Sequence, residues 1–182
     1  DSVLVKVNNE IPEATFTTVN HCDGDTIQFS SNSGLTTSNI AWEWSFGEST
    51  QNPLQELSLG GNVIQLIVVN LDNNCSDTIV KIIEIYPLPV ANFTANEVCL
   101  GVPTIFVNNS SANVVYWEYS MNDGLGSSTA TNPNYTYQSS GEFYPSLVVT
   151  SNFSCTSEQS IKVEVNELPF ANFLVENNCV GE

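Results

Sequence analysis

The feature that most constrains this chain is an internal repeat. Three segments of the 182-residue sequence begin alike, with Ala-x-Phe followed six residues later by Cys-x-Gly. They are residues 14–24, 91–101 and 171–181, offset by 77 and 80 residues. Further positions recur in the same order, namely Phe29 with Phe106, Trp42 with Trp117, Trp44 with Tyr119, Pro53 with Pro133, Gly61 with Gly141 and Cys75 with Cys155. Such a period indicates one module, about 80 residues long, repeated along the chain.

The repeat also predicts the domain boundaries. We expect residues 13–89 to form the first whole repeat and residues 90–169 the second, because each ends on an apolar alternation that runs into proline. Residues 1–12 have the pattern of the closing strand of a preceding repeat, and residues 170–182 that of the opening strand of a following one. The chain is therefore expected to be a window cut from a longer tandem array.

Within each repeat the hydrophobic period is two. Trp42 and Trp44 alternate with Glu43 and Ser45, which is typical of a strand with one buried face. The β-prone runs of the first repeat, separated by clusters of Asn, Asp, Gly, Ser and Pro, are residues 26–30, 40–46, 63–70 and 78–85. Short strands at this spacing favour an all-β chain of sandwiches, with about seven strands in each.

The charge balance and the lack of a long apolar run argue against two classes of partner, nucleic acid and the membrane interior. Twenty acidic residues stand against three lysines and no arginine, which gives a net charge of −17. We therefore expect no nucleic-acid binding, since attraction to phosphate requires basic side chains. No apolar run approaches the ~18 residues of a spanning helix, so we expect no insertion into a membrane. Apolar residues make up 41% of the chain, which is enough for a packed core.

The order of these residues resembles the PKD domain, an immunoglobulin-like sandwich common in secreted bacterial proteins. The resemblance rests on Ala-x-Phe, Cys-x-Gly, Phe, Trp, Asn-Pro, Gly, Val-Val, Cys and a closing strand that ends in proline. The variant with cysteines resembles arrays in very large surface proteins of gliding bacteria, such as SprB-type adhesins exported by a type IX system. The chain departs from the family's Trp-x-Phe-Gly-Asp-Gly turn at residues 44–49 and 119–124.

The resemblance implies tandem immunoglobulin-like sandwiches at an oxidising cell surface, where recurring cysteines form disulfides. Two pairings are open. Within each repeat, Cys22 would pair with Cys75 and Cys99 with Cys155. In an immunoglobulin-like topology, however, Cys22 and Cys75 lie at opposite ends of the module, about 30 Å apart. We therefore favour Cys22 with Cys155, a staple across the boundary between repeats.

Three polar residues near the first cysteine are candidates for metal binding. His21 is the one histidine, but the spacing of the cysteines does not match a zinc site, so we expect His21 to be a loop residue. Asp23 and Asp25 flank a glycine and are weak candidates for calcium, with Asp72 or Asp77 as further ligands brought close by folding. Apart from calcium, we expect no cofactor.

The aromatic residues divide into core and surface candidates. Trp42 and Trp117 lie in the central strand of each repeat and match the buried tryptophan of immunoglobulin-like sandwiches. The candidates for contact with a ligand are Tyr116, Tyr135, Tyr144 and Phe153, all in the second repeat.

These patterns favour a structural function. We expect tension-carrying spacer modules in the extended stalk of an extracellular cell-surface adhesin, used in adhesion or gliding motility, whose partners are the adjacent repeats. Other parts of the protein would contact an extracellular surface or polysaccharide. The alternative is a module that itself binds a glycan or a protein. We expect no enzyme, because a sandwich of about 80 residues has no cleft for paired carboxylates.

Overall fold

The computed structural model of the chain describes residues 10–36 and 39–174. The chain divides into two compact units, Asp1–Leu88 and Pro89–Glu182. The described residues form strands and turns without a helix, and this part of the chain holds no helix long and apolar enough to span a membrane. Most of the predicted strand at 1–12 and the end of the one at 170–182 lie outside the described residues, and residues 10–14 and 170–174 form no strand.

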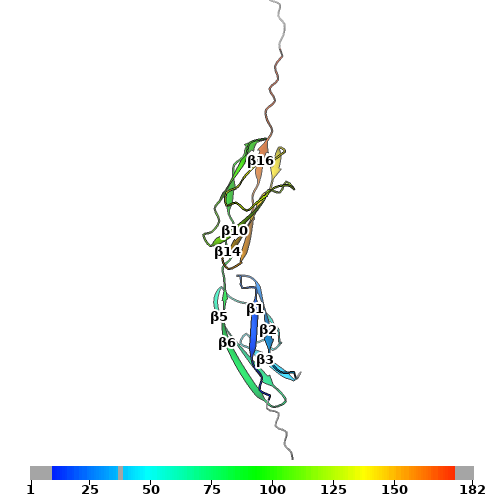
Figure 1. The fold of residues 1–182 in the computed structure, drawn as a ribbon, viewed down its shortest axis with the longest axis vertical. Coiled ribbons are helices and arrows are strands. Elements are labelled where there is room, and N and C mark those ends of the chain that lie inside the picture. The colour runs from blue at the N-terminus through cyan, green and yellow to red at the C-terminus, as the bar shows by residue number, and fades with distance from the viewer. Residues whose placement is uncertain (1–9, 37–38, 175–182) are drawn as a thin grey trace, which may run out of the picture. The chain divides into compact units, whose positions relative to one another are not determined.

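The first unit is a sandwich of two three-stranded sheets (Figure 1). Within its described residues the strands are β1 (Thr15–Val19), β2 (Thr26–Asn32), β3 (Ile40–Trp44), β4 (Leu54–Glu56), β5 (Gly60–Asn70) and β6 (Cys75–Ile85). One sheet has the order β1-β2-β4 and the other the order β3-β5-β6. All of the strand pairings inside these sheets are antiparallel.

The second unit repeats this plan with more interrupted strands. Its strands are β7 (Phe93–Ala95), β8 (Val98–Cys99), β9 (Thr104–Asn108), β10 (Val114–Ser120), β11 (Ser127–Ser128), β12 (Asn134–Tyr135), β13 (Gly141–Phe143), β14 (Ser146–Ser151), β15 (Thr156–Ser160) and β16 (Val163–Asn166). The sheets have the orders β12-β9-β7, β11-β10-β14-β15 and β13-β16-β8. The long β5–β6 hairpin of the first unit thus corresponds to two shorter pairings here, β13–β16 and β14–β15.

The strand order confirms the predicted fold class. The first, second and fourth strands of the first unit share one sheet, and the third, fifth and sixth share the other, as strands A, B, E and C, F, G do in an immunoglobulin-like sandwich. The first unit has six strands among its described residues rather than about seven, because the polar segment between β3 and β4 folds into turns. There the backbone NH of Gly47 donates to the carbonyl of Trp44 (2.9 Å).

Alternation of apolar and polar residues directs the side chains of each strand. In β2, Ile27 and Phe29 are fully buried, whereas Thr26, Gln28 and Ser30 on the other face are exposed. In β5, Leu66 and Val68 are fully buried in the same way. Because successive side chains of a strand point to opposite faces, this pattern forces two sheets to close over one apolar layer.

Each core centres on three aromatic rings at equivalent positions. In the first unit the Trp44 ring centroid lies 5.2 Å from that of Phe16 and 5.0 Å from that of Phe29. In the second unit Phe93, Phe106 and Tyr119 form the equivalent cluster. Edge-to-face packing of this kind stabilises a core beyond the area that it buries.

One of the two predicted core tryptophans departs from expectation. Trp42 lies in the first core, as predicted. Trp117 packs against the second core but is partly exposed, and its buried indole nitrogen has no hydrogen-bond partner among the described residues. A β-bulge between Val114 and Tyr116 turns Val114 into the core. Trp117 keeps the register of Trp42, since each pairs with a buried valine, Val149 and Val68.

The separate cores predict independent destabilisation. Phe106→Ala removes a fully buried ring from the second unit and should lower the free energy of unfolding of that unit by about 3–5 kcal/mol. Hydrogen exchange in urea, read by mass spectrometry, should detect lost protection in strands β7–β16 and unchanged protection in β1–β6. Val107→Ala, at a 44% exposed position, is the matched control. Equal loss in both units would contradict independent cores.

Candidate functional site

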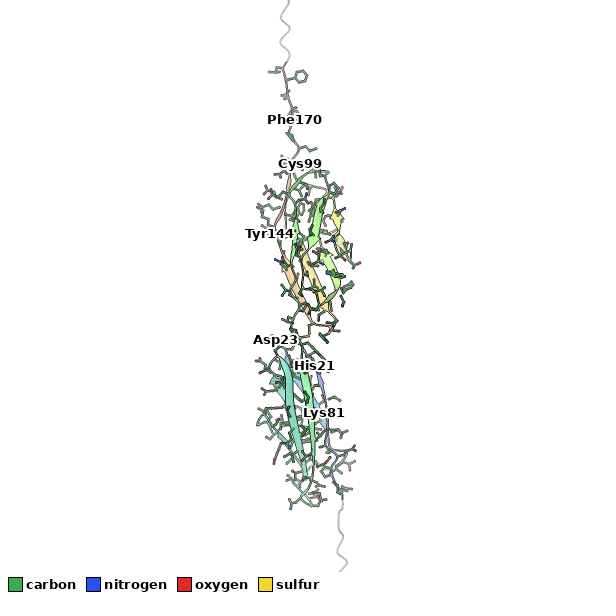
Figure 2. The ribbon with its side chains drawn as sticks, turned by 90° about the vertical axis from the view of Figure 1, so that its left-hand side faces the viewer. His21, Asp23, Lys81, Cys99, Tyr144 and Phe170 are labelled. Atoms are coloured by element: carbon green, nitrogen blue, oxygen red, sulfur yellow. The ribbon has the colours of Figure 1, made fainter. Side chains whose placement is uncertain are left out.

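Two cysteines lie at the C-terminal end of their units, the end at which the chain leaves the unit after its last strand. Cys22 forms a parallel bridge with Tyr86, just after β6, and the NH of Asp23 donates to the carbonyl of Tyr86 (2.8 Å). In the second unit Cys99 pairs in parallel with Asn166 at the end of β16. Figure 2 shows Cys99 at the end of the second unit from which Phe170 leaves.

The turn that follows each of these cysteines explains the Cys-x-Gly motif. The NH of Asp25 donates to the carbonyl of Cys22 over 3.0 Å, and the NH of Val102 donates to that of Cys99 over 3.0 Å. The glycine inside each turn has a positive φ, +82° at Gly24 and +87° at Gly101. Glycine adopts this conformation without strain, so the motif specifies the same turn twice.

The other two described cysteines lie in the turn between the last two long strands. In the first unit Cys75 pairs with Asn70 and closes the β5–β6 turn. The side-chain amides of Asn70 and Asn73 both donate to the carbonyl of Glu10 (3.1 Å each), so this turn lies beside the incoming chain. Cys75 therefore lies at the N-terminal end of its unit.

Cys155 occupies the equivalent place in the second unit. The NH of Ser151 donates to the carbonyl of Cys155 (2.8 Å) across the β14–β15 turn. The NH of Asn152, in the same turn, donates to the carbonyl of Asn113 (3.2 Å). The preceding loop also holds the incoming chain, since the NH of Ser111 donates to the carbonyl of Val90 (3.0 Å). Each unit thus carries one cysteine at each end.

The states of the cysteines overturn one of the two predicted pairings. Cys22 and Cys155 are disulfide-bonded, whereas Cys75 and Cys99 are free thiols. The within-repeat pairings Cys22–Cys75 and Cys99–Cys155 are therefore wrong. The physical reason is the length of the ladder: the ten residue steps of β6 from Cys75 to Ile85 span about 33 Å, far beyond the reach of a disulfide. Cys179 lies outside the described residues.

His21 is a loop residue between β1 and β2, beside the first cysteine. Its ring nitrogen Nε2 lies 2.9 Å from Oγ1 of Thr18, and its carbonyl accepts a hydrogen bond from the NH of Tyr86 (2.8 Å). Figure 2 shows His21 and Asp23 at one end of the first unit, away from Lys81 in β6.

The structure does not bring the calcium candidates together. Asp72 lies in the turn at the opposite end of the unit from Asp23 and Asp25, and its carboxylate accepts a hydrogen bond from Asn39 (2.6 Å). The NH groups of Ala14 and Thr78 donate to Asp77 and lower the pKa of its carboxyl group. Among the described residues, no three His, Cys, Asp or Glu side chains gather where they could hold a metal ion.

The aromatic candidates for ligand contact do not form one platform. Tyr116 is paired with Thr150 near one end of β10, and Tyr144 lies beyond Ser146, which is paired with Ser120 at the other end. The four steps between these pairs span about 13 Å. Tyr135 is in β12, which belongs to the other sheet. Phe153 lies in the β14–β15 turn, two residues before Cys155.

Tyr135 has a structural contact that the sequence did not suggest. Its hydroxyl donates to Oδ2 of Asp123 (2.5 Å), while Oδ1 of Asp123 accepts from the NH groups of Leu125 and Gly126. A Cβ at Gly126 would lie 2.5 Å from ring carbons of Tyr135, so only glycine allows the approach. The Asp-Gly-x-Gly sequence of residues 123–126 is the signal that could have predicted this turn.

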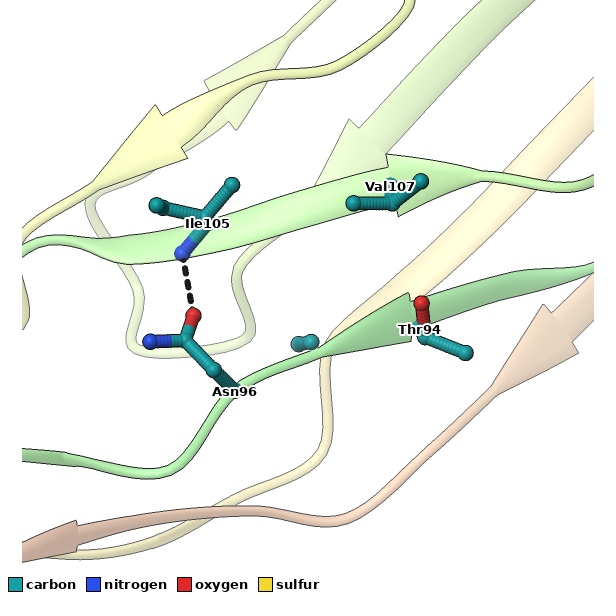
Figure 3. Close-up of a pocket in the computed structure, with 5 residues that line it drawn as sticks. Thr94, Asn96, Ile105 and Val107 are labelled. Atoms are coloured by element: carbon teal, nitrogen blue, oxygen red, sulfur yellow. Dashed lines mark hydrogen bonds between the residues drawn. The ribbon is translucent and has the colours of Figure 1, made fainter.

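An open hollow of about 430 Å³ lies on the outer face of β7 and β9, lined by Ala95, Ile105 and Val107 among others (Figure 3). The side-chain oxygen of Asn96 accepts a hydrogen bond from the NH of Ile105 (2.7 Å) and so extends the pairing of these strands. The sequence repeat puts Gln28 and Ser30 at the positions of Ile105 and Val107. The apolar lining is therefore not common to the two repeats.

The chain is similar to several solved structures, of which three are described as domains or modules. The PKD1 domain of Vibrio anguillarum Epp is 24% identical, with a TM-score of 0.41 over 44% of this chain and 96% of that domain. The PKD1 domain of the Vibrio cholerae metalloprotease PrtV is 24% identical, with a TM-score of 0.39 over 43% of this chain and 98% of that one. The fibronectin(III)-like modules of Clostridium thermocellum CbhA are 11% identical, with a TM-score of 0.45 over 88% of this chain and all of theirs.

No protein-family model matches the chain, and no curated protein matches it. The assignment of the fold as an immunoglobulin-like sandwich accordingly rests on the strand order and pairing of the two units.

The Asp123–Tyr135 contact predicts a pH-dependent contribution to stability. Desolvation raises the pKa of Asp123, but hydrogen bonds from Tyr135, Leu125 and Gly126 together hold it below the ordinary value. A lowered folded-state pKa stabilises the unit above the unfolded-state pKa of about 3.9, and this stabilisation is lost as the pH falls through the folded-state value.

Tyr135→Phe should therefore raise the pKa of Asp123 in the folded unit, as read by NMR titration of the carboxyl carbon. The variant should be less stable than the wild type at pH 7, and the difference should shrink as the pH falls below the unfolded-state pKa of about 3.9. Tyr116→Phe, at an exposed position, is the control and should leave the pKa of Asp123 unchanged. A pH-independent loss of stability in Tyr135→Phe would contradict the contact.

Proposed function

We propose that this chain is a segment of a tandem array of PKD-like, immunoglobulin-like repeats that serve as a tension-carrying spacer. The repeats are residues 13–89 and 90–169, and the array is the stalk of a secreted cell-surface adhesin used in adhesion or gliding motility. The role is structural and not catalytic. The observation that carries the proposal is the placement of a cysteine at each end of both units, with Cys22 and Cys155 disulfide-bonded.

In this proposal Cys22 pairs with Cys155 and staples consecutive repeats together. The position of each cysteine in its own unit supports the pairing. Cys22 is bridged to Tyr86, the residue before Pro87, at the end where the first unit passes into the second. Cys155 lies in the turn that contacts the loop holding Val90, where the chain enters the second unit. Both cysteines thus flank the same short linker.

The pairing of the terminal strands supports a load-bearing role. In the second unit β8, which continues the first strand, runs parallel to β16, the last strand. When the staple is reduced and no longer bypasses the unit, tension on its two ends pulls these strands in opposite directions along their length. Their hydrogen bonds are then loaded together in shear, which resists force better than opening them one at a time.

Charge and linker sequence support an extended array. The net charge of −17 opposes folding of one repeat back on another. Pro87 and Pro89 fix φ and hold the residues before them in extended geometry. The partners would be the adjacent repeats, and an extracellular surface or polysaccharide would be bound by other parts of the protein. A disulfide is typical of an oxidising, extracellular location.

The same observations do not favour the alternative, in which the repeats themselves bind a glycan or a protein. Tyr116 lies in β10, Tyr135 in β12 and Tyr144 between β13 and β14, and the three do not converge. The hydroxyl of Tyr135 is engaged by Asp123. We therefore propose the spacer alone.

The pairing is tested by mass spectrometry of peptides from the unreduced protein. We expect a linked peptide pair that contains Cys22 and Cys155, together with alkylated peptides that contain Cys75 and Cys99. Reduction should release the linked pair. A linked pair of Cys22 with Cys179, or of any within-repeat combination, would contradict the staple.

Single-molecule pulling on the two termini tests the mechanical role. A Cys22–Cys155 disulfide encloses the 132 residues from 23 to 154, which then cannot be extended. Reduction should add about 460 Å of contour length, at roughly 3.5 Å per residue. In the reduced protein each unit should unfold in a discrete step.

The control is the protein with Cys22→Ser and Cys155→Ser, which should extend fully without a reductant. Equal contour length before and after reduction would contradict the staple. Smooth extension of the reduced protein at low force would instead contradict the load-bearing role.

A further inference from the structure

The free cysteine at the C-terminal end of the second unit is built like its bonded counterpart. Both cysteines pair in parallel with a residue at the end of the last strand. Cys22 pairs with Tyr86, just after β6, and Cys99 pairs with Asn166, the last residue of β16. The residue after each donates its NH to the carbonyl of that strand residue over 2.8 Å. Each cysteine carbonyl then accepts an NH from three residues ahead over 3.0 Å. The two backbones therefore present the thiol in the same way.

The free cysteine at the N-terminal end of the first unit likewise matches its bonded counterpart. Cys75 and Cys155 both close the turn between the last long strands. The residue before each has a positive φ, 56° at Asn74 and 66° at Ser154, which is uncommon for residues other than glycine. A shared uncommon conformation fixes the direction in which each cysteine leaves its turn.

We propose that Cys99 and Cys75 are the two halves of a second staple, so that Cys99 of one copy of this chain forms a disulfide with Cys75 of another, head to tail. The proposal rests on the proposed Cys22–Cys155 pairing, because it transfers that pairing to the equivalent positions. The partner is thus a second copy of the chain, or in an array the neighbouring repeat.

Exposure and the neighbouring side chains support this partner. Cys99 is exposed and Cys75 is half-buried, and each is more exposed than its bonded counterpart. An apolar side chain that is 49% exposed accompanies each one, Val102 beside Cys99 and Leu71 beside Cys75. Contact between the two ends would remove both side chains from water, which favours the association.

The chemistry is thiol–disulfide exchange with oxidised glutathione as the oxidant. The thiolate of Cys99 attacks one sulfur of glutathione disulfide, which forms a mixed disulfide and releases one glutathione thiolate. The thiolate of Cys75 from the second copy then attacks the Cys99 sulfur and releases the other. Two protein thiols lose two electrons and two protons, and one glutathione disulfide becomes two glutathione thiols.

The test uses the full chain with Cys179→Ser, in two variants that carry different mass tags. One variant has Cys75→Ser and retains Cys99, and the other has Cys99→Ser and retains Cys75. The two are mixed in equal amounts with oxidised glutathione, and the disulfide-linked dimers are quantified by non-reducing electrophoresis and mass spectrometry. Random coupling would give as much heterodimer as the two homodimers together.

We expect the heterodimer to exceed the two homodimers together by roughly fivefold, because one end must fit the other. The parent Cys179→Ser chain, with both thiols, should form a ladder of multimers that collapses on reduction. Heterodimer at or below the random share would overturn the proposal.

Peptide mapping of the same samples separates this proposal from the one on which it rests. If Cys22 and Cys155 are linked but the heterodimer is not preferred, the second staple is wrong and the boundary staple stands. If Cys22 and Cys155 are not linked to each other, the boundary staple is wrong and the transfer of its geometry fails with it.

Discussion

The structure depends on one contact, the parallel pairing between the continuation of the first strand and the end of the last strand. In the first unit it is the bridge of Cys22 with Tyr86, and in the second it is the pairing of β8 with β16. This contact joins the first strand to the sheet of the last strand at the C-terminal end of the module. It also carries the Cys-x-Gly turn to the end where the chain leaves. The last strand then spans the unit, so its preceding turn holds the second cysteine at the opposite end.

The two units solve the same packing problem with different chemistry. Trp44 donates its indole NH to the carbonyl of Thr50 (2.9 Å), and Tyr119 donates its hydroxyl to the carbonyl of Thr131 (3.2 Å). Each central ring thus satisfies its polar atom on a loop carbonyl further along its own unit, Thr50 before β4 and Thr131 before β12. Burial raises the pKa of Tyr119 to about 12. Among the described residues the Asp123 turn occurs in the second unit alone, and the positions that correspond to residues 123–126 are residues 48–51 of the first. The scaffold and its cysteine positions are common to both repeats, while the turns and surfaces differ, which is the pattern expected of a structural module.

Much of this could be predicted from the sequence, because the relevant signals are local. The alternation of apolar and polar residues indicated the strands, and the internal repeat indicated which residues of the two units are equivalent. The contact of Tyr135 with Asp123 could not be predicted in the same way, since it joins residues twelve positions apart whose approach depends on Gly126. Trp117 is less covered than Trp42 although both pair with a buried valine, and no local sequence signal distinguishes the two tryptophans. The candidate ligands Asp72 and Asp77 failed for a geometric reason: a ladder about 33 Å long separates Asp72 from Asp23.

The position of Cys22 beside Tyr86 determines how the proposed staple would stabilise the array. When the second unit unfolds and the first stays folded, Cys22 remains fixed at the end where the linker begins. The unfolded segment is then a closed loop of about 70 residues, from Tyr86 to Cys155, and its lost entropy corresponds to about 4 kcal/mol on the chain-entropy model. A cysteine in the middle of the first unit would enclose folded strands instead and hold the two repeats less closely. A staple beside the linker thus stabilises the repeat that follows it while leaving the preceding sandwich unstrained, and the same arrangement can be repeated along an array of any length.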